Sequence, residues 1–369
     1  MIYLDHHAAA PAPEPVRRAM QEAATVAWAN PSSTHAAGRA SRRLLEAARD
    51  DVAKSIGATA ADVVLTGGGT EACNLGIRGV AAGRVRVVTS QVEHPAVAQS
   101  VGRLGTEGRE VITLSVVEGQ PPSPAQLAPH LGPDTLVAVQ WVNHETGTVF
   151  PIHEYAQACR QHQAHLFVDA TQALGKVPVD VGALGADAVA IAAQKIGGPA
   201  GAGACWVRRG LELQPVLDGG LQERGRRPGT PDTLSMVGFG AACRSIGDRL
   251  AGQPRVTELR DRIEATLVQL GAVPNGRAPR TGTVSNLSFQ GWKGPLLAAA
   301  LDVEGVCLST GAACSSGLQE PSAVIRAMYP DEQWRAGSAV RISLGIETTE
   351  RDIETASRAF RQILARGGA

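Results

Sequence analysis

A lysine and a carboxylate each stand at the end of an apolar stretch of this sequence. Lys195 follows residues 188–194 and precedes a glycine-rich turn, and Asp169 ends another apolar stretch upstream. Ligands of α/β folds bind at the carboxyl ends of sheet strands, where partial desolvation lowers a lysine pKa toward that of a nucleophilic amine. A solvated strand-end lysine and a helix-capping aspartate are the alternative interpretations of these two residues.

Residues 63–71 predict a strand that runs through a triple-glycine turn into a helix. The N–H groups and the dipole at such a helix start bind phosphate, and this one includes Gly69 and the hydroxyl of Thr70. An ordinary tight turn is the alternative, and the spacing fits neither common nucleotide motif. Pyridoxal phosphate requires such a phosphate site, a lysine that binds its aldehyde and an acid that keeps its ring nitrogen protonated. Lys195, Asp169 and this turn together predict a pyridoxal phosphate site.

Three further polar residues, His94, Asn143 and Gln172, follow predicted strands. The imidazole of His94 can stack on a cofactor ring and move protons near neutral pH. The amides of Asn143 and Gln172 can donate a hydrogen bond to a ring oxygen. Each of the three also fits a simple loop or turn position.

A cysteine and an arginine near the C-terminus are candidates for action on a substrate. Cys314 lies in residues 309–317, a small-residue segment too polar and flexible for a core strand, where an exposed thiol can act as a travelling nucleophile. Cys307, between two apolar residues, is expected to be buried and inert. Arg341 interrupts an apolar strand pattern and is expected to pair with a carboxylate of the protein or of a substrate.

The composition excludes several classes of protein. The chain has 369 residues with 35 basic and 35 acidic side chains, so it has no general attraction for nucleic acid or an anionic membrane. No stretch approaches the ~18 apolar residues of a membrane span, and the first ten residues lack the basic start of a signal peptide. The six cysteines form no C-x-x-C pair and no regular framework, which favours a reduced, cytoplasmic protein without a zinc or other metal site.

Only four lysines occur among the 35 basic residues, which narrows the search for a catalytic amine. Lys54 is expected on the exposed face of a helix, Lys176 in a turn before a proline, and Lys293 in a glycine-flanked loop. Lys195 differs from them because it ends a predicted strand.

The elements that must position these residues follow an α/β pattern, in which apolar β-branched runs alternate with amphipathic stretches. Residues 39–56 carry apolar side chains on one helical face. A smaller α+β domain is expected from about residue 286, connected through helices at 233–270 and closed by a helix capped by Thr348 or Thr349. The strands expected in the two domains are 63–66, 85–89, 111–114, 136–142, 166–169, 188–192 and 204–207, then 286–289, a strand near 306, and 340–344.

The order and spacing of the motifs resemble the NifS/IscS-type cysteine desulfurases, of the class V aminotransferase group with the fold-type I pyridoxal phosphate architecture. The resemblance runs nearly end to end. Its motifs are Tyr3-Leu4-Asp5, residues 30–35 from Asn30, Gly68-Gly69-Thr70-Glu71, Glu93-His94-Pro95, residues 142–147 around Asn143, residues 168–172 with Asp169 and Gln172, Lys195, Gln222-Glu223-Arg224-Gly225, Gly229-Thr230, residues 313–317 with Cys314, Glu320-Pro321-Ser322 and residues 341–345 from Arg341.

The resemblance implies a fold and a role for each candidate. It implies a large cofactor domain, residues 14–255, with a mostly parallel seven-stranded sheet, and a small domain made of residues 1–13 and 256–369. The implied cofactor contacts are Lys195 at the aldehyde, Asp169 at the ring nitrogen, His94 on the ring, Asn143 and Gln172 at the 3′ oxygen, and Gly69, Thr70, Gln194 and Thr230 at the phosphate, with Thr230 supplied by the neighbouring subunit of a homodimer.

The implied reaction converts L-cysteine to L-alanine and leaves a persulfide on Cys314. Lys195 and His94 would move protons, Arg341 and Asn30 would bind the substrate, and an acceptor protein would collect the sulfur for iron–sulfur cluster assembly or thiolation. A related lyase, for instance one acting on selenocysteine, and a degenerate scaffold or sulfur-relay partner are the alternatives.

Departures from the family pattern are concentrated around the lysine. Gln194 and Ala192 replace a histidine and a serine that usually bind phosphate, and an alanine cannot donate a hydrogen bond. Gly197 replaces an aromatic residue, and Ala9 and Ala10 replace threonines. These changes affect the expected cofactor affinity and turnover more than the type of reaction.

Overall fold

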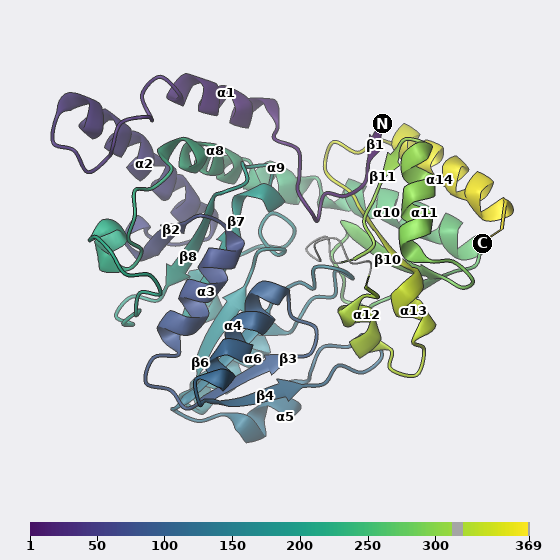
Figure 1. Ribbon diagram of the computed structural model, residues 1–369, viewed down its shortest axis with the longest axis horizontal. Coiled ribbons are helices and arrows are strands. Elements are labelled where there is room, and N and C mark those ends of the chain that lie inside the picture. The colour runs from purple at the N-terminus through teal and green to yellow at the C-terminus, as the bar shows by residue number, and fades with distance from the viewer. Residues whose placement is uncertain (312–319, 368–369) are drawn as a thin grey trace.

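A computed structural model of the protein describes residues 1–311 and 320–367. Its large domain contains a seven-stranded sheet in the order β2-β8-β7-β6-β5-β3-β4 (Figure 1). Strand β8 pairs antiparallel with both of its neighbours, and the other pairings are parallel. All seven strands lie where the sequence predicts them. Their bounds are β2 Val63–Thr66, β3 Arg86–Ser90, β4 Glu110–Leu114, β5 Thr135–Gln140, β6 His165–Asp169, β7 Ala188–Ala192 and β8 Gly203–Val207.

The sheet separates two hydrophobic cores, because successive side chains of a strand point to opposite faces. In β5, Val137 and Val139 enter one core, whereas Leu136 and Ala138 enter the other. Helices cover both faces and make a three-layer domain. The first face is covered by α1 Glu14–Ala23, α2 Ala36–Ser55, α6 Ile152–Gln161 and α8 Thr233–Arg244, and the second by α3 Gly69–Val80 and α4 Pro95–Thr106.

Helix α2 confirms the amphipathic helix predicted at 39–56. It begins three residues earlier than predicted because Nδ1 of His35 accepts a hydrogen bond from Gly38 N and caps the first turn. Among the described residues, no helix is both long and apolar enough to cross a membrane. The short elements of the large domain are α5 Pro124–Leu127, α7 Val181–Leu184 and four 3-10 turns at Ala60–Asp62, Ala128–His130, Ala193–Lys195 and Gln222–Gly225.

The small domain has its own core beneath a three-stranded antiparallel sheet in the order β12-β10-β9. Thr349 caps its last helix, as predicted, because its hydroxyl accepts from Asp352 N while the Asp352 carboxylate accepts from Thr349 N. The elements from the connection onward are α9 Ile246–Ala251, α10 Gln253–Gln269, β9 Ala272–Asn275, β10 Val284–Phe289, α11 Gly294–Val303, β11 Val306–Cys307, β12 Ala339–Ser343 and α14 Glu350–Ala365.

Two short helices of the C-terminal part pack on the core of the large domain. Helix α12, Ala323–Met328, is followed by α13, Trp334–Ser338. Val324, Ile325 and Met328 belong to the same buried cluster as the first face of the large sheet. The domain division proposed from the sequence therefore stays a prediction, because residues assigned to one domain help to fill the core of the other.

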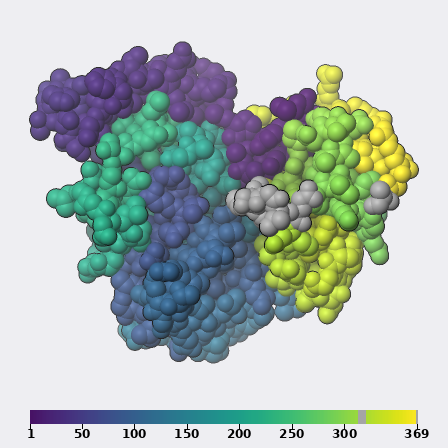
Figure 2. Space-filling model, in the orientation of Figure 1, coloured from purple at the N-terminus to yellow at the C-terminus, as the bar shows by residue number. Residues whose placement is uncertain are grey.

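The N-terminal arm, residues 1–13, contacts both domains and lies at their junction, as Figure 2 shows. Its strand β1, Ile2–Tyr3, pairs in parallel with β11, and Leu4 is fully buried in the core of the small domain. Further along, the N–H of Ala10 donates to the carbonyl of Gln194 in the large domain, at 2.8 Å. The arm therefore connects the small domain to the residue beside Lys195.

Two details differ from the expectations. Strand β5 ends at Gln140 instead of Val142, because the chain turns back and Val142 forms an isolated bridge with Val149. Cys307 is only partly buried, so the expectation that it is buried and inert is wrong about its burial. It follows the buried Val306 in a two-residue strand, so its side chain points to the opposite, uncovered face.

We expect Leu4→Ala to lower the free energy of unfolding by about 3 kcal/mol, because it removes a fully buried side chain that holds the arm in the small domain. Urea unfolding measures the change. Leu296→Ala is the matched control, since that leucine is half-exposed on α11 and its loss should change the free energy by under about 0.5 kcal/mol. Equal effects of the two substitutions would contradict this account of the arm.

Candidate active site

A cavity of about 170 Å³ lies at the carboxyl ends of β5, β6 and β7, against the small domain. The structure brings eight of the predicted site residues together in its wall. They are Gly69, Thr70, His94, Asp169, Gln172, Gln194 and Lys195, and Arg341 of β12 joins them from the small domain.

The lysine and the carboxylate lie on neighbouring strands. Asp169 ends β6 opposite Ala190 of β7, and Lys195 closes the 3-10 turn that follows β7. The ammonium of Lys195 donates to the backbone carbonyls of His7 and Ala8, at 2.9 and 2.8 Å. The buried carboxylate of Asp169 accepts from Thr171 N, at 2.9 Å. The arm therefore supplies the acceptors for the ammonium group of Lys195.

The glycine-rich turn between β2 and α3 is held close to β8. A Cβ atom on Gly203 of β8 would lie 2.5 Å from the backbone carbonyl carbon of Gly68, so only a glycine allows this approach. A Cβ on Gly69 would lie 3.1 Å from the Cβ of Ala192. The start of α3 therefore faces the end of β7, and its N–H groups and Thr70 line the cavity.

These residues fit pyridoxal phosphate. The cavity combines an amine, a carboxylate on the adjacent strand and a helix N-terminus. Oε1 of Gln194 is buried at the edge of this helix start and has no hydrogen-bond partner within the described residues. Of the two ends of this amide, only the Nε2 group could donate a hydrogen bond to a phosphate, because phosphate oxygens are acceptors.

His94 forms an edge-to-face pair with a second histidine, His144, at a ring-centroid distance of 5.1 Å. Nδ1 of His94 accepts from Ala96 N, so the neutral ring carries its proton on Nε2. Burial lowers the pKa of His94. Burial also holds the pKa of His144 well below its usual value. The lowered pKa values therefore favour the neutral form of both rings.

Arg341 is almost fully buried and is already paired with a carboxylate. Its NH2 lies 2.8 Å from Oδ1 of Asp5 in the arm, and its NH1 donates to the carbonyl of His144, at 3.0 Å. Of the two partners expected for this arginine, a protein acid or a substrate carboxylate, the structure shows the protein acid. Because Arg341 also lines the cavity, its guanidinium can meet a substrate carboxylate there.

The two predicted amides have different environments. Gln172 lines the cavity, donates from Nε2 to the carbonyl of His7 and accepts at Oε1 from Nζ of Lys176, both at 2.9 Å. Asn143 is fully buried outside the cavity wall, where Oδ1 caps the turn by accepting from the N–H groups of Glu145 and Thr146. Asn143 therefore shapes the turn that carries His144, and its contact with a ring oxygen stays a prediction.

Comparison with known proteins agrees with this geometry. Residues 2–355 match the family described as Aminotransferase class-V. The chain belongs to this family. An IscS-like cysteine desulfurase of Mycobacterium tuberculosis is 37% identical, covering 100% of both chains. A cysteine desulfurase IscS of Anaeromyxobacter dehalogenans is 39% identical, covering 97% of this chain and 91% of its own.

Solved structures extend the similarity to the fold. A NifS-like protein superposes with a TM-score of 0.92 at 27% identity and covers 99% of both chains. A structure of SspA in complex with cysteine gives a TM-score of 0.82 at 27% identity, covering 95% of this chain and 100% of its own. The resemblance and the fold class predicted from the sequence are confirmed.

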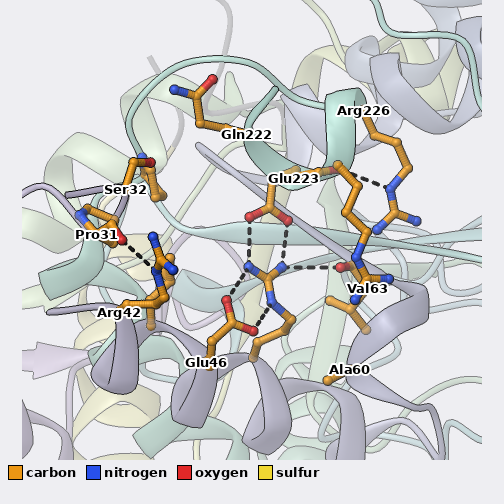
Figure 3. Close-up of a pocket in the computed structure, with 13 residues that line it drawn as sticks. Pro31, Ser32, Arg42, Glu46, Ala60, Val63, Gln222, Glu223 and Arg226 are labelled. Atoms are coloured by element: carbon orange, nitrogen blue, oxygen red, sulfur yellow. Dashed lines mark hydrogen bonds and ion pairs between the residues drawn. The ribbon is translucent and has the colours of Figure 1, made fainter. Parts of the chain in front are cut away.

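Two further predicted site residues do not line the cavity that contains Lys195. Asn30 and Thr230 are exposed, next to segments that line a second cavity of about 190 Å³ (Figure 3). Glu46 and Glu223 point toward each other there, and the guanidinium of Arg49 bonds both carboxylates. The same Glu223 carboxylate accepts from the N–H of residue 65 in β2, at 3.0 Å. The segment before Thr230 is thereby fixed to the strand that leads into the glycine-rich turn.

Cys314 lies outside the described residues, and its predicted role stays a prediction. Four residues without a role predicted from the sequence contact a site residue: Asp5, His7, His144 and Lys176. Asp5 and His144 stand inside motifs that carry the family resemblance, which is the signal that could have identified them. The carbonyl of His7 and the position of Lys176 have no comparable signal in the sequence.

We expect Gly203→Ala to destabilise the protein by about 1–3 kcal/mol and to weaken pyridoxal phosphate binding, because the new methyl group would push on the backbone of the glycine-rich turn. Thermal unfolding and equilibrium cofactor titration measure the two effects. Gly102→Ala is the control, since a Cβ there meets nothing within 4 Å in α4 and should be neutral or stabilising. Normal cofactor affinity in Gly203→Ala would contradict the close packing described.

Proposed function

We propose that this protein is a pyridoxal phosphate-dependent cysteine desulfurase that converts L-cysteine to L-alanine and transfers the sulfur to Cys314. The observation that carries the proposal is the single cavity in which Lys195, Asp169 and the glycine-rich helix start face Arg341. Relatives named as cysteine desulfurases align over nearly the whole chain at 35–39% identity, which favours this activity within the family.

The residues around the cavity would hold the cofactor by distinct contacts. When bound, pyridoxal phosphate supplies an electron sink for the electrons released at the substrate Cα. Asp169 would keep the ring nitrogen protonated, and the ring of His94 would lie against the cofactor ring. Gln172 and Asn143 would serve the 3′ oxygen, Lys195 the aldehyde, and Gly69, Thr70 and Gln194 the phosphate.

The protein's own groups then carry the substrate chemistry. Arg341, with Asn30, would bind the substrate. The amine of Lys195 would take the proton from Cα and return a proton to the product carbon. Between these steps it would donate hydrogen bonds to the carbonyls of His7 and Ala8. His94, neutral because burial lowers its pKa, would accept a proton from a thiol.

The proposed sulfur transfer needs no external oxidant. The thiolate of Cys314 would attack the substrate sulfur, so that a sulfur–sulfur bond forms while the bond from sulfur to the substrate carbon breaks. The electron pair of the broken bond stays with the carbon, which is protonated to give alanine. Cys314 is left as a persulfide.

Cys314→Ser tests the assignment. We expect the variant to keep the cofactor absorption spectrum but to lose alanine and sulfide formation from L-cysteine. Cys307→Ser, which alters a half-exposed thiol of β11, is the matched control and should keep full activity. Full activity of Cys314→Ser would reject the desulfurase proposal and favour a lyase that needs no thiol, such as one acting on selenocysteine.

We propose that the protein acts as a homodimer in which Thr230 serves the site of the neighbouring subunit. Thr230 is exposed and lies outside the cavity wall of its own chain, which supports this assignment.

Hybrid dimers test the exchange of Thr230. In a hybrid of Lys195→Ala and Thr230→Glu subunits, one site has both native residues if Thr230 crosses between subunits. We therefore expect the hybrid to regain cofactor-dependent activity that neither parent has, because the introduced carboxylate repels phosphate only in the other site. A hybrid as inactive as its parents would show that Thr230 serves its own subunit.

The persulfide requires a protein that accepts its sulfur, and we propose delivery in the cytoplasm to iron–sulfur cluster assembly or to thiolation. The five described cysteines are free thiols, which suits a reducing compartment. Transfer of labelled sulfur from the loaded protein to candidate acceptor proteins would identify the pathway, and the absence of any transfer would count against this role.

A further inference from the structure

Lys176 lies directly behind the candidate active site, and the proposed function gives it no role. It belongs to the turn after β6, is partly buried, and donates from Nζ to Oε1 of Gln172, at 2.9 Å. Nε2 of the same glutamine donates to the carbonyl of His7, at 2.9 Å, and the ammonium of Lys195 donates to that carbonyl as well. A chain of hydrogen bonds thus connects Lys176 to Lys195 through Gln172 and the arm.

The chemistry of these groups fixes the orientation of the Gln172 amide. A lysine ammonium has only donors, and a backbone carbonyl has only an acceptor. The amide oxygen must therefore face Lys176, and the amide NH2 must face His7 and the cavity. The side chain of Gln172 is buried, so an amide oxygen deprived of its lysine partner would carry the cost of an unsatisfied acceptor and would leave this position.

We propose that Lys176 is a positioning residue that holds the Gln172 amide with its NH2 group toward the cofactor oxygen. The inference rests on the proposed function, because Gln172 acts on pyridoxal phosphate only if the cofactor occupies this cavity. Lys176 itself lines a separate small cavity on the other side of Lys195, so it acts through the glutamine.

The surroundings of Lys176 differ from those of an ordinary solvated lysine. Burial holds the pKa of Lys176 well below its usual value, and the positive charges of Lys195, Arg249 and Arg341 lower it further. His6 faces the same cavity. Both the charged and the neutral amine carry N–H donors, so the hydrogen bond to Gln172 persists through this titration.

The test is a double-mutant cycle on the reconstituted full-length protein, read from the pH titration of the bound cofactor's absorption band. In Lys176→Met we expect the midpoint to rise by about one pH unit, because a ring oxygen without its donor is more negative and favours the protonated form. Pyridoxal phosphate should bind about tenfold more weakly, as equilibrium dialysis would measure. In the Gln172→Met background, Lys176→Met should add no further shift.

The controls separate this role from other effects. Lys54→Met removes an exposed lysine of α2 and should leave the midpoint and the affinity unchanged. If Lys176→Met does not fold, Lys176→Gln keeps a polar side chain without requiring one amide orientation, and it should show a smaller shift of the same sign.

Two results would overturn the inference. An unchanged midpoint in Lys176→Met would show that Gln172 keeps its place without the lysine. An equal shift in the native and Gln172→Met backgrounds would show a direct effect of the lysine charge on the cofactor. A wild-type protein that develops no cofactor band would instead reject the proposed function itself.

Discussion

The parallel pairing of β5, β6 and β7 is the constraint on which the site depends. Parallel strands end at the same edge of a sheet, so Asp169 at the end of β6 and Lys195 after β7 are placed side by side. The turn from β2 reaches the same region because β8 runs antiparallel and brings Gly203 against Gly68. Three chemical groups that are far apart in the sequence therefore converge on one cavity.

The N-terminal arm completes what the sheet begins. Lys176, Lys195, Arg249 and Arg341 concentrate positive charge in a partly dehydrated region, which is costly without acceptors. The arm supplies acceptors for two of them, the Asp5 carboxylate for Arg341 and the carbonyls of His7 and Ala8 for Lys195. Because the arm is anchored in the small domain through β1 and Leu4, the geometry of the site is coupled to the packing of the two domains.

Local patterns in the sequence were sufficient for the strands and for the residues at their ends. An apolar run such as residues 188–192 predicts a strand by itself. A lysine or aspartate at the end of such a run can be identified before the fold is known. The end of β5 at Gln140 and the exposure of Cys307 were not visible, because each depends on which strand lies alongside.

The sequence by itself determined the alternation of strands and helices, the candidate amine, acid, phosphate turn and thiol, and the family that these motifs resemble. Only the tertiary structure decided the partners: Asp5 for Arg341, and the carbonyl of His7 for Lys195 and Gln172. The physical reason is that a hydrogen bond between residues distant in sequence has no periodicity or composition to reveal it. It exists only once the arm is docked between two separately packed cores.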